Sequence, residues 1–215
     1  MALGWRTGVG KDSVARKLVG VAQDAVREAL GSHALDGRMI ARRISTAYPI
    51  KRMVFREAPI CPGNEDLLHP AIYEAHPEKK DEAFASGATI RDVWCAVGEA
   101  FRLLDPLFWL RKTSIAVNDG LARIVVIPDV RKVIEFDYWK ARRGLLVNIL
   151  GLGTKCKSTD VDDDNVKWDL RVVNDRRYRN AEGVSFAAGS IWERGILPRL
   201  RGMYEKQIAG DGGES

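Results

Sequence analysis

The stretch from Gly4 to Ser13 constrains this chain more than any other, because it joins a glycine-rich loop to the start of a helix. Its sequence is Gly-Trp-Arg-Thr-Gly-Val-Gly-Lys-Asp-Ser. Glycines let backbone N–H groups turn toward one anion, and the first turn of a helix adds the positive end of its dipole. Lys11 can then reach the terminal phosphates of a nucleotide, while the hydroxyl of Ser13 can hold Mg²⁺. The stretch therefore predicts a phosphate-binding loop.

The match of this stretch to the pattern G-x-x-x-x-G-K-[ST] is incomplete. Trp5 stands where the first glycine is expected, and Asp12 separates the lysine from the hydroxyl residue. Only Met1–Gly4 precede the loop, which is shorter than the ~5–6 residues of an ordinary strand. A second interpretation therefore stays open, in which the stretch is a glycine-rich turn that caps a helix and binds no ligand.

The composition is that of a globular protein, with 46% hydrophobic and 29% charged residues in 215. No apolar run approaches the ~20 residues of a membrane span, so we expect no membrane partner. The 3 cysteines and 3 histidines have neither disulfide nor zinc spacing, which favours a cytoplasmic protein. A net charge of +5 suits an anionic ligand, but the basic residues are spread along the chain, so no specific nucleic-acid partner is indicated.

Apolar spacing predicts strands that alternate with helices. Strands are expected at about 1–4, 38–46, 122–127, 145–150 and 169–173, and helices at about 11–30, 53–58, 90–104, 106–119, 132–143 and 188–206. The run from Ile124 to Ile127 is continuously apolar, as is typical of a strand buried on both faces of a parallel sheet. We therefore expect an α/β fold, with a mostly parallel sheet and helices on both faces.

The chain is predicted to form a single domain over residues 1–209. A polar segment interrupted by prolines, at about 61–86, is expected to be a mobile insertion that carries short helices. Two interpretations of this insertion are open, a surface excursion and a lobe that closes over a ligand. Residues 210–215 are expected to form a disordered tail.

Six short segments follow one another along the chain, and five of them match a pattern given in brackets. The first three are Gly8–Ala15 (G-x-G-K-D-[ST]-x-A), Ala47–Lys51 (A-[DY]-P-[LI]-K) and Arg91–Arg102 (R-x-x-x-Q-x-x-G-x-x-x-R, whose Gln is absent here). The others are Asp105–Trp109 (D-P-x-x-W), Ile127–Glu135 (I-x-D-x-R-x-x-x-E) and the late Val173-Asn174-Asp175. Over roughly residues 1–180 they resemble the deoxynucleoside monophosphate kinases of bacteriophages and prophages. The resemblance implies a three-layer fold like that of the P-loop nucleoside-phosphate kinases. It also places the insertion on the acceptor side.

The activity that the resemblance implies is transfer of the γ-phosphoryl group of ATP to a deoxynucleoside monophosphate, with ATP and Mg²⁺ as cofactors and ADP and a diphosphate as products. The implied catalytic residues are Lys11, Asp12, Arg91, Arg102 and Arg131. The implied nucleotide-binding residues are Gly8, Val9, Gly10, Lys11, Asp12 and Ser13. Substrate contacts are implied for Lys51, Arg91 and Asp129, and metal contacts for Ser13 and Asp129.

Alternatives remain open for these assignments. Asp129 can instead be the N-cap of the helix that follows it, and Asp12 can be an ordinary first-turn residue favoured by the helix dipole. Another P-loop small-molecule kinase, such as one like dephospho-coenzyme A kinase, would share the loop and Mg²⁺. A non-catalytic nucleotide- or DNA-binding protein would also suit the basic charge. The expected partners are small nucleotides, a homodimer is compatible with the sequence, and a phage-encoded protein would act in the host cytoplasm.

Overall fold

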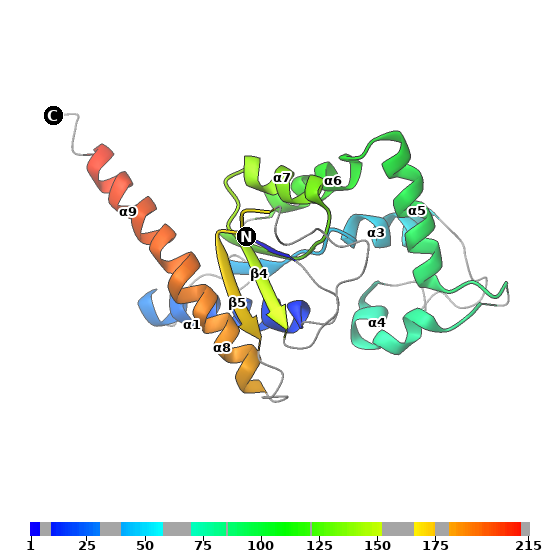
Figure 1. Ribbon diagram of the computed structural model, residues 1–215, viewed down its shortest axis with the longest axis horizontal. Helices are drawn as coiled ribbons and strands as arrows, with labels where there is room; N and C mark the ends of the chain where they lie inside the picture. The colour runs from blue at the N-terminus through cyan, green and yellow to red at the C-terminus, as the bar shows by residue number, and fades with distance from the viewer. Residues whose placement is uncertain are drawn as a thin grey trace. The chain divides into compact units, whose positions relative to one another are not determined.

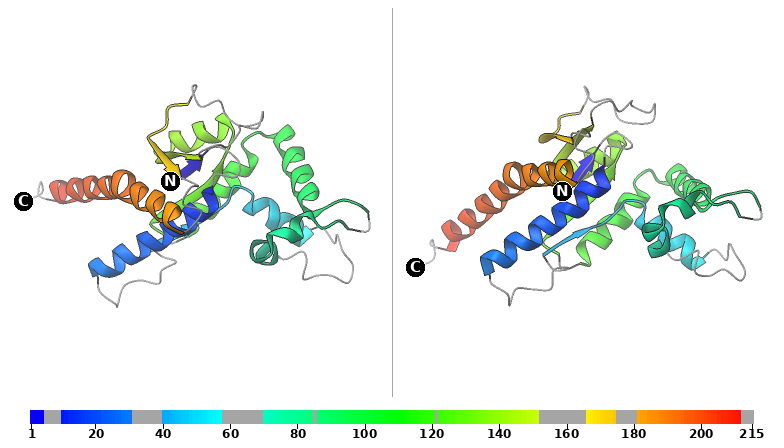
Figure 2. Two further views of the ribbon diagram at one scale, coloured as in Figure 1. Left: turned by 60° about the horizontal axis from the view of Figure 1, so that its bottom comes forward. Right: turned by 90° about the horizontal axis from the view of Figure 1, so that it is seen from below.

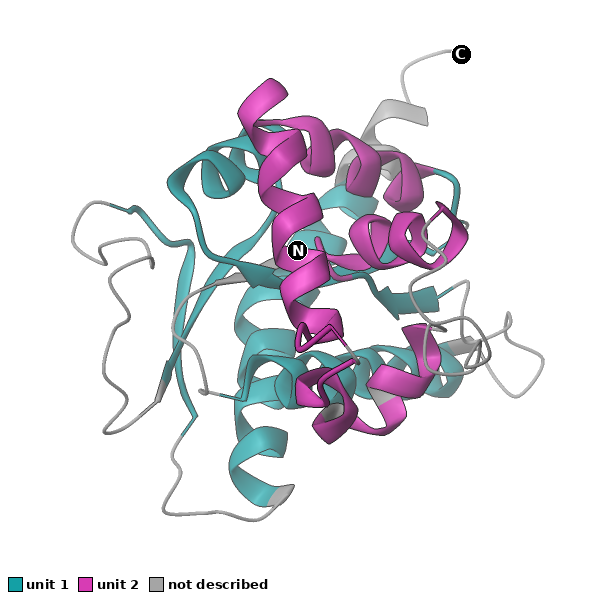
Figure 3. Ribbon diagram, turned by 90° about the vertical axis from the view of Figure 1, so that its right-hand side faces the viewer, with its two compact units in different colours: residues 1–44, 119–215 teal, residues 45–118 magenta. Residues whose placement is uncertain are grey.

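The computed structural model describes residues 1–4, 10–30, 40–57, 70–84, 86–120, 122–151, 166–174 and 181–211. The chain divides into two compact units, each described here by itself (Figure 3). Unit 1 comprises Met1–Ile44 and Asp119–Ser215, and unit 2 comprises Ser45–Asn118. The expected insertion at 61–86 lies within unit 2; its residues 61–69 and 85 are outside the described part of the chain.

Among the described residues, five parallel strands form the sheet of unit 1. They are β1 (Ala2–Gly4), β2 (Ala41–Arg43), β3 (Ile124–Val130), β4 (Leu146–Gly151) and β5 (Leu170–Asn174). Figure 1 labels β4 and β5 among these strands. Their order is β2-β3-β1-β4-β5, and every neighbouring pair is parallel. The predicted α/β class with parallel strands is therefore confirmed.

The shortest predicted strand, β1, lies at the centre of this sheet. Ala2 is opposite Ile127 of β3 on one side and opposite Leu146 of β4 on the other. The register against β3 shifts between Ala2 and Gly4, so β3 contains a bulge. The sequence predicted that this strand ends at Ile127, but it continues to Val130. Pro128, which lacks an N–H group, lies at this bulge, where a strand tolerates proline.

Two helices bury the main core of unit 1 against one face of the sheet. They are α1 (Lys11–Leu30), with the bounds that its apolar spacing predicts, and α8 (Ala181–Ile191). Their buried side chains pack with those of three strands: Val14, Ala15, Leu18, Ala187, Ala188 and Ile191 from the helices, and Val126, Val147, Ile149, Leu170 and Val172 from the sheet. Helix α7 (Val133–Ala141) contacts β4 and lies on the other side of the strands from α1 (Figure 2). Leu146 and Val147 are adjacent residues of β4, so they point to opposite faces of the sheet, and both are fully buried.

The C-terminal helix is longer than the predicted 188–206. It comprises α8, one π-helical turn over Trp192–Ile196, and α9 (Leu197–Asp211). In the wide turn the N–H of Leu197 donates to the carbonyl of Trp192. Pro198 follows directly and has no N–H group, so the α-helical bond from residue 198 to the carbonyl four residues earlier cannot form. Helix α9 includes Gly210 and Asp211, and residues 212–215 lie outside the described chain.

Unit 2 consists of helices around a small core of its own. They are α3 (Tyr48–Glu57), α4 (Pro70–Ala75), a 3₁₀ turn η2 (Pro77–Asp81), α5 (Ile90–Leu104) and α6 (Phe108–Asn118). Val54, Tyr73 and Ile90 are buried together. The predicted N-cap Thr89 is confirmed, because its hydroxyl accepts the N–H of Asp92 (3.2 Å) while the Asp92 carboxylate accepts the N–H of Thr89 (2.8 Å).

Two helix starts in unit 2 differ from the prediction. Helix α3 begins at Tyr48 and not at Met53, because Pro49 lies in the first turn, where a missing N–H costs nothing. Helix α6 begins at Phe108 and not at Pro106. Asp105 ends α5 and its carboxylate accepts the N–H of Leu107 (3.0 Å), which holds a turn before the next helix. Among the described helices of both units, none combines the length and apolar content that crossing a bilayer requires.

Asp169 ties three elements of unit 1 together and gives a test of this packing. Its carboxylate accepts the N–H of Leu146 at the start of β4 (2.9 Å), binds the ammonium of Lys140 (2.6 Å) and lies 3.5 Å from the guanidinium of Arg199 on α9. Partial burial raises the pKa of Asp169, but the bonds from Lys140 and Leu146 outweigh it and hold that pKa below its ordinary value of 3.8. The ionised form therefore stabilises the fold above the ordinary pKa, and this contribution is lost as pH falls through the depressed folded-state pKa.

We expect Asp169→Asn to lower the free energy of unfolding by about 1 kcal/mol at neutral pH, after allowance for solvent screening. The difference from the parent should vanish in acid, below the depressed pKa. Urea unfolding at neutral pH and at a series of decreasing acidic pH values measures both quantities. The matched control is Asp137→Asn, which removes an exposed carboxylate from α7 and should leave the unfolding energy nearly unchanged. A loss that grows as the pH falls would contradict this account.

Candidate phosphate-binding site

The carboxyl ends of the strands and the first turn of α1 form the candidate site, which we call the strand-end site. All the strands are parallel, so their carboxyl ends share one edge of the sheet. The chain leaves β1 at this edge and enters α1. The neighbours of β1 are β3 on one side and β4 on the other. The connection from β1 to β2 therefore runs toward one edge of the sheet, and the connection from β3 to β4 crosses to the other side of β1. Ligands of open α/β sheets bind at such a point.

Gly10 closes the loop onto α1 in a conformation that favours glycine. Its φ is +79°, and a Cβ atom built there would lie 2.8 Å from Nδ2 of Asn174, the last residue of β5. Its carbonyl accepts the N–H of Val14 (2.9 Å), the first bond of the helix. The loop and the late Asn174 segment of the predicted motif therefore meet here. The other predicted loop residues, Trp5, Gly8 and Val9, lie outside the described part of the chain, as does Asp175.

Lys11 is the first residue of α1 and is only 7% exposed. Lys11 therefore lies in the first turn of α1, where the backbone N–H groups carry the positive end of the helix dipole. A lysine and a helix start together favour a bound polyanion. Ser13, in the same turn, is exposed and can turn its hydroxyl to a ligand.

Arg43 is a site residue that the sequence reasoning missed. It ends β2, and its Nη1 lies 2.6 Å from Oδ1 of Asp12 in the first turn of α1. The signal was present, because a basic residue at the carboxyl end of a predicted parallel strand faces the same edge as the loop. The expected bounds of that strand, 38–46, were too broad to identify Arg43 as its end.

Asp129 and Arg131 lie at the end of β3, as predicted, but the strand covers Asp129 itself. Asp129 is half-buried, and the N-cap of α7 is Lys132. The carboxylate of Glu135 accepts the N–H groups of Arg131 (2.7 Å) and Lys132 (3.1 Å), so Glu135 caps the helix. The interpretation of Asp129 as an N-cap is therefore wrong. The glutamate of the I-x-D-x-R-x-x-x-E segment has a structural role here.

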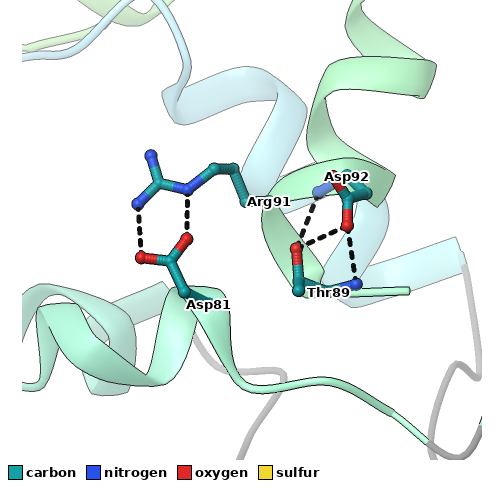
Figure 4. A network of polar contacts seen from close by, with 4 residues as sticks. All are labelled: Asp81, Thr89, Arg91 and Asp92. Carbon is teal, nitrogen blue, oxygen red and sulfur yellow. Dashed lines mark hydrogen bonds and ion pairs between the residues drawn. The ribbon is translucent and has the colours of Figure 1, made fainter. Parts of the chain in front are cut away.

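The remaining predicted residues belong to unit 2 and are engaged within it. Arg91 binds Asp81 through two parallel bonds, from Nε (2.6 Å) and Nη2 (3.1 Å), beside the Thr89–Asp92 cap (Figure 4). This hydrogen-bonded pair raises the pKa of Arg91 and lowers that of Asp81.

Arg102 and Lys51 also have partners in unit 2. Arg102 pairs with Glu99 (2.6 Å), and Nζ of Lys51 lies 5.2 Å from the ring centroid of Trp94. The structure thus brings Lys11, Asp12 and Ser13 together in unit 1, while the three predicted cations of unit 2 contact residues of that unit.

The strand-end site offers oxygen donors of the kind that Mg²⁺ accepts. Within the described ranges, no three His, Cys, Asp or Glu side chains are grouped closely enough to hold a metal ion. Mg²⁺ usually takes only one or two protein ligands and fills its other positions with water and substrate phosphates. A hydroxyl such as that of Ser13 and a carboxylate such as that of Asp129 are suitable donors for it.

No protein-family model matches the chain, and no curated protein sequence matches it either.

Gly10, which directly precedes α1, and Gly20 within α1 provide a test of the loop geometry. Gly10→Ala should lower the free energy of unfolding by ~1–3 kcal/mol, because alanine is strained at positive φ and its methyl group would press on buried Asn174. Gly20→Ala is the matched control, since a Cβ atom there meets nothing within 4 Å and alanine favours a helix interior. We expect it to raise the unfolding energy by ~0.5–1 kcal/mol. Denaturant unfolding measures both, and equal stabilisation by the two alanines would contradict this geometry.

Proposed function

We propose that this protein is a deoxynucleoside monophosphate kinase, which transfers the γ-phosphoryl group of ATP to a deoxynucleoside monophosphate and releases ADP and a diphosphate. One observation carries the proposal. A buried lysine begins α1 directly after a glycine at positive φ, at the carboxyl edge of five parallel strands. This combination of amides, dipole and ammonium suits a polyphosphate.

Phosphoryl transfer requires positive charge and correct positioning of the two substrates, and it needs no covalent intermediate with the protein. In phosphoryl transfer, negative charge spreads over the moving group, and the protein lowers the barrier by holding donor and acceptor in line within a positive field. Lys11 would neutralise the β- and γ-phosphate oxygens, and the N–H groups of Gly10 and Asp12 would bind the phosphates together with those of Gly8 and Val9. Mg²⁺, when bound, would supply further positive charge to offset that of the phosphates.

The residues of this chain that would hold Mg²⁺ are Ser13, through its hydroxyl, and Asp129, through the water shell of the ion. The placement of β1 between β3 and β4 supports the finer fold that we propose, a three-layer arrangement like that of the P-loop nucleoside-phosphate kinases. Arg131 would supply a further positive charge at the end of β3.

Arg91 is the residue of unit 2 that we propose as a ligand of the acceptor phosphate. Arg91 already makes a two-pronged contact with a carboxylate, and a guanidinium takes a phosphate in the same planar geometry. We infer that the acceptor phosphate takes the place of the Asp81 carboxylate on Arg91. Arg102 and Lys51 are further cations of unit 2 that we propose as phosphate ligands.

Replacement of Lys11 tests the central charge. We expect Lys11→Ala to lower ATP turnover with the preferred acceptor at least ~100-fold, because the developing charge on the transferred group loses its nearest cation. Lys17→Ala is the matched control, since Lys17 is an exposed lysine on the same helix, and it should keep the parent rate. A coupled assay of ADP release measures both, with thermal unfolding to establish that each variant is folded. Equal turnover in the parent and Lys11→Ala would disprove the kinase proposal.

A screen of acceptors tests the substrate class. ADP should form from ATP in the presence of at least one of dTMP, dGMP, dCMP and dAMP. Formation of ADP only with another small molecule would favour a different P-loop kinase. DNA binding that weakens steeply with salt, without turnover, would favour a non-catalytic binding protein.

A further inference from the structure

Asp12 poses an electrostatic problem for a polyphosphate site. It follows Lys11 in the first turn of α1, and its side chain is 67% exposed, so its carboxylate stands where an anionic ligand would approach. A first-turn aspartate is favourable for the empty helix because it complements the dipole. For a helix that must accept phosphate, the same carboxylate is a like charge at short range.

Arg43 is placed where it cancels that charge. Its Nη1 lies 2.6 Å from Oδ1 of Asp12, and its side chain is only 18% exposed. The backbone of β2 is set by its pairing with β3, with Arg43 opposite Val126 and the N–H of Ile44 bonded to the Val126 carbonyl (2.9 Å). The guanidinium is therefore presented to α1 from a hydrogen-bonded strand, which limits the conformational entropy lost in forming the pair.

We propose that Arg43 is a positioning residue of the strand-end site, which neutralises Asp12 and so keeps the start of α1 attractive to the triphosphate of ATP. The inference rests on the proposed function and adds a residue to it. With the pair intact, the positive charge of Lys11 and the helix amides act on the ligand without opposition. Without Arg43, the carboxylate of Asp12 repels the phosphates and competes for Lys11.

Two simpler roles for Arg43 make different predictions. If Arg43 binds the phosphates directly, its loss weakens ATP binding whether or not Asp12 is charged. If the pair only stabilises the fold, its loss lowers the melting temperature and leaves the affinity for ATP unchanged. A double-mutant cycle that reads affinity and melting temperature separates the three cases.

The measurement is the dissociation constant of MgATP, by titration calorimetry, for the parent, Arg43→Gln, Asp12→Asn and the double variant. We expect Arg43→Gln to bind MgATP about tenfold more weakly, as the loss of one member of a close charge pair does. Asp12→Asn alone should tighten binding by less than about threefold, because the paired carboxylate is already screened. In the Arg43→Gln background, the same change should restore affinity to within about threefold of the parent. Arg43→Lys, which keeps the charge, should also bind within about threefold of the parent.

The ion pair between Arg27 and Asp24 (Nη1 to Oδ1, 3.3 Å) is the matched control. It also joins an arginine to an aspartate of α1, but it lies far from the first turn of that helix. Arg27→Gln and Asp24→Asn should leave the affinity for MgATP at its parent value. The proposed role of Arg43 is overturned if the double variant binds MgATP as weakly as Arg43→Gln does, or if Arg43→Gln binds it as tightly as the parent. In either case, binding of MgATP by the parent still supports the nucleotide site. A folded parent that binds no MgATP overturns the proposed function and this inference together.

Discussion

The backbone pairing of β1 is the interaction on which the rest of unit 1 depends. This strand covers only Ala2–Gly4, yet it is hydrogen-bonded to β3 on one side and β4 on the other. Buried amide groups must be paired, and a central strand satisfies donors and acceptors on both of its edges. Two-sided pairing therefore allows so short a segment to hold its place. It also sets where α1 begins, because the loop that follows β1 leads directly to Gly10 and Lys11.

The strand-end site collects charged groups whose energies depend on one another. Lys11 is buried at the positive end of α1, Asp12 is in the same turn, and Arg43 reaches Asp12 from β2. The positive end of the helix dipole and a lysine together favour a bound anion. The role that we propose for Arg43 is to keep the charge of Asp12 from opposing that attraction.

Most of the local structure could be predicted from the sequence where the cause is local. The apolar spacing of α1 predicted its bounds, the Thr89 cap was identified from the residue type, and the β-branched run around Val125 predicted a buried parallel strand. Several of the errors in element bounds lie at prolines. Pro49, Pro106 and Pro128 each constrain the chain, but neighbouring hydrogen bonds decide whether a helix start, a turn or a bulge results.

The sequence by itself determined the kinds of elements, the glycine-rich start of α1 and the candidate cations, because these follow from side-chain spacing and backbone freedom within a few residues. Only the tertiary structure decided that β1 lies between β3 and β4, that Glu135 caps α7 in place of Asp129, and that Arg43 pairs with Asp12. Such contacts join residues far apart in the chain. Strand order and register decide which of many chemically equivalent carboxylates and guanidiniums meet. A short stretch of sequence does not specify either of them.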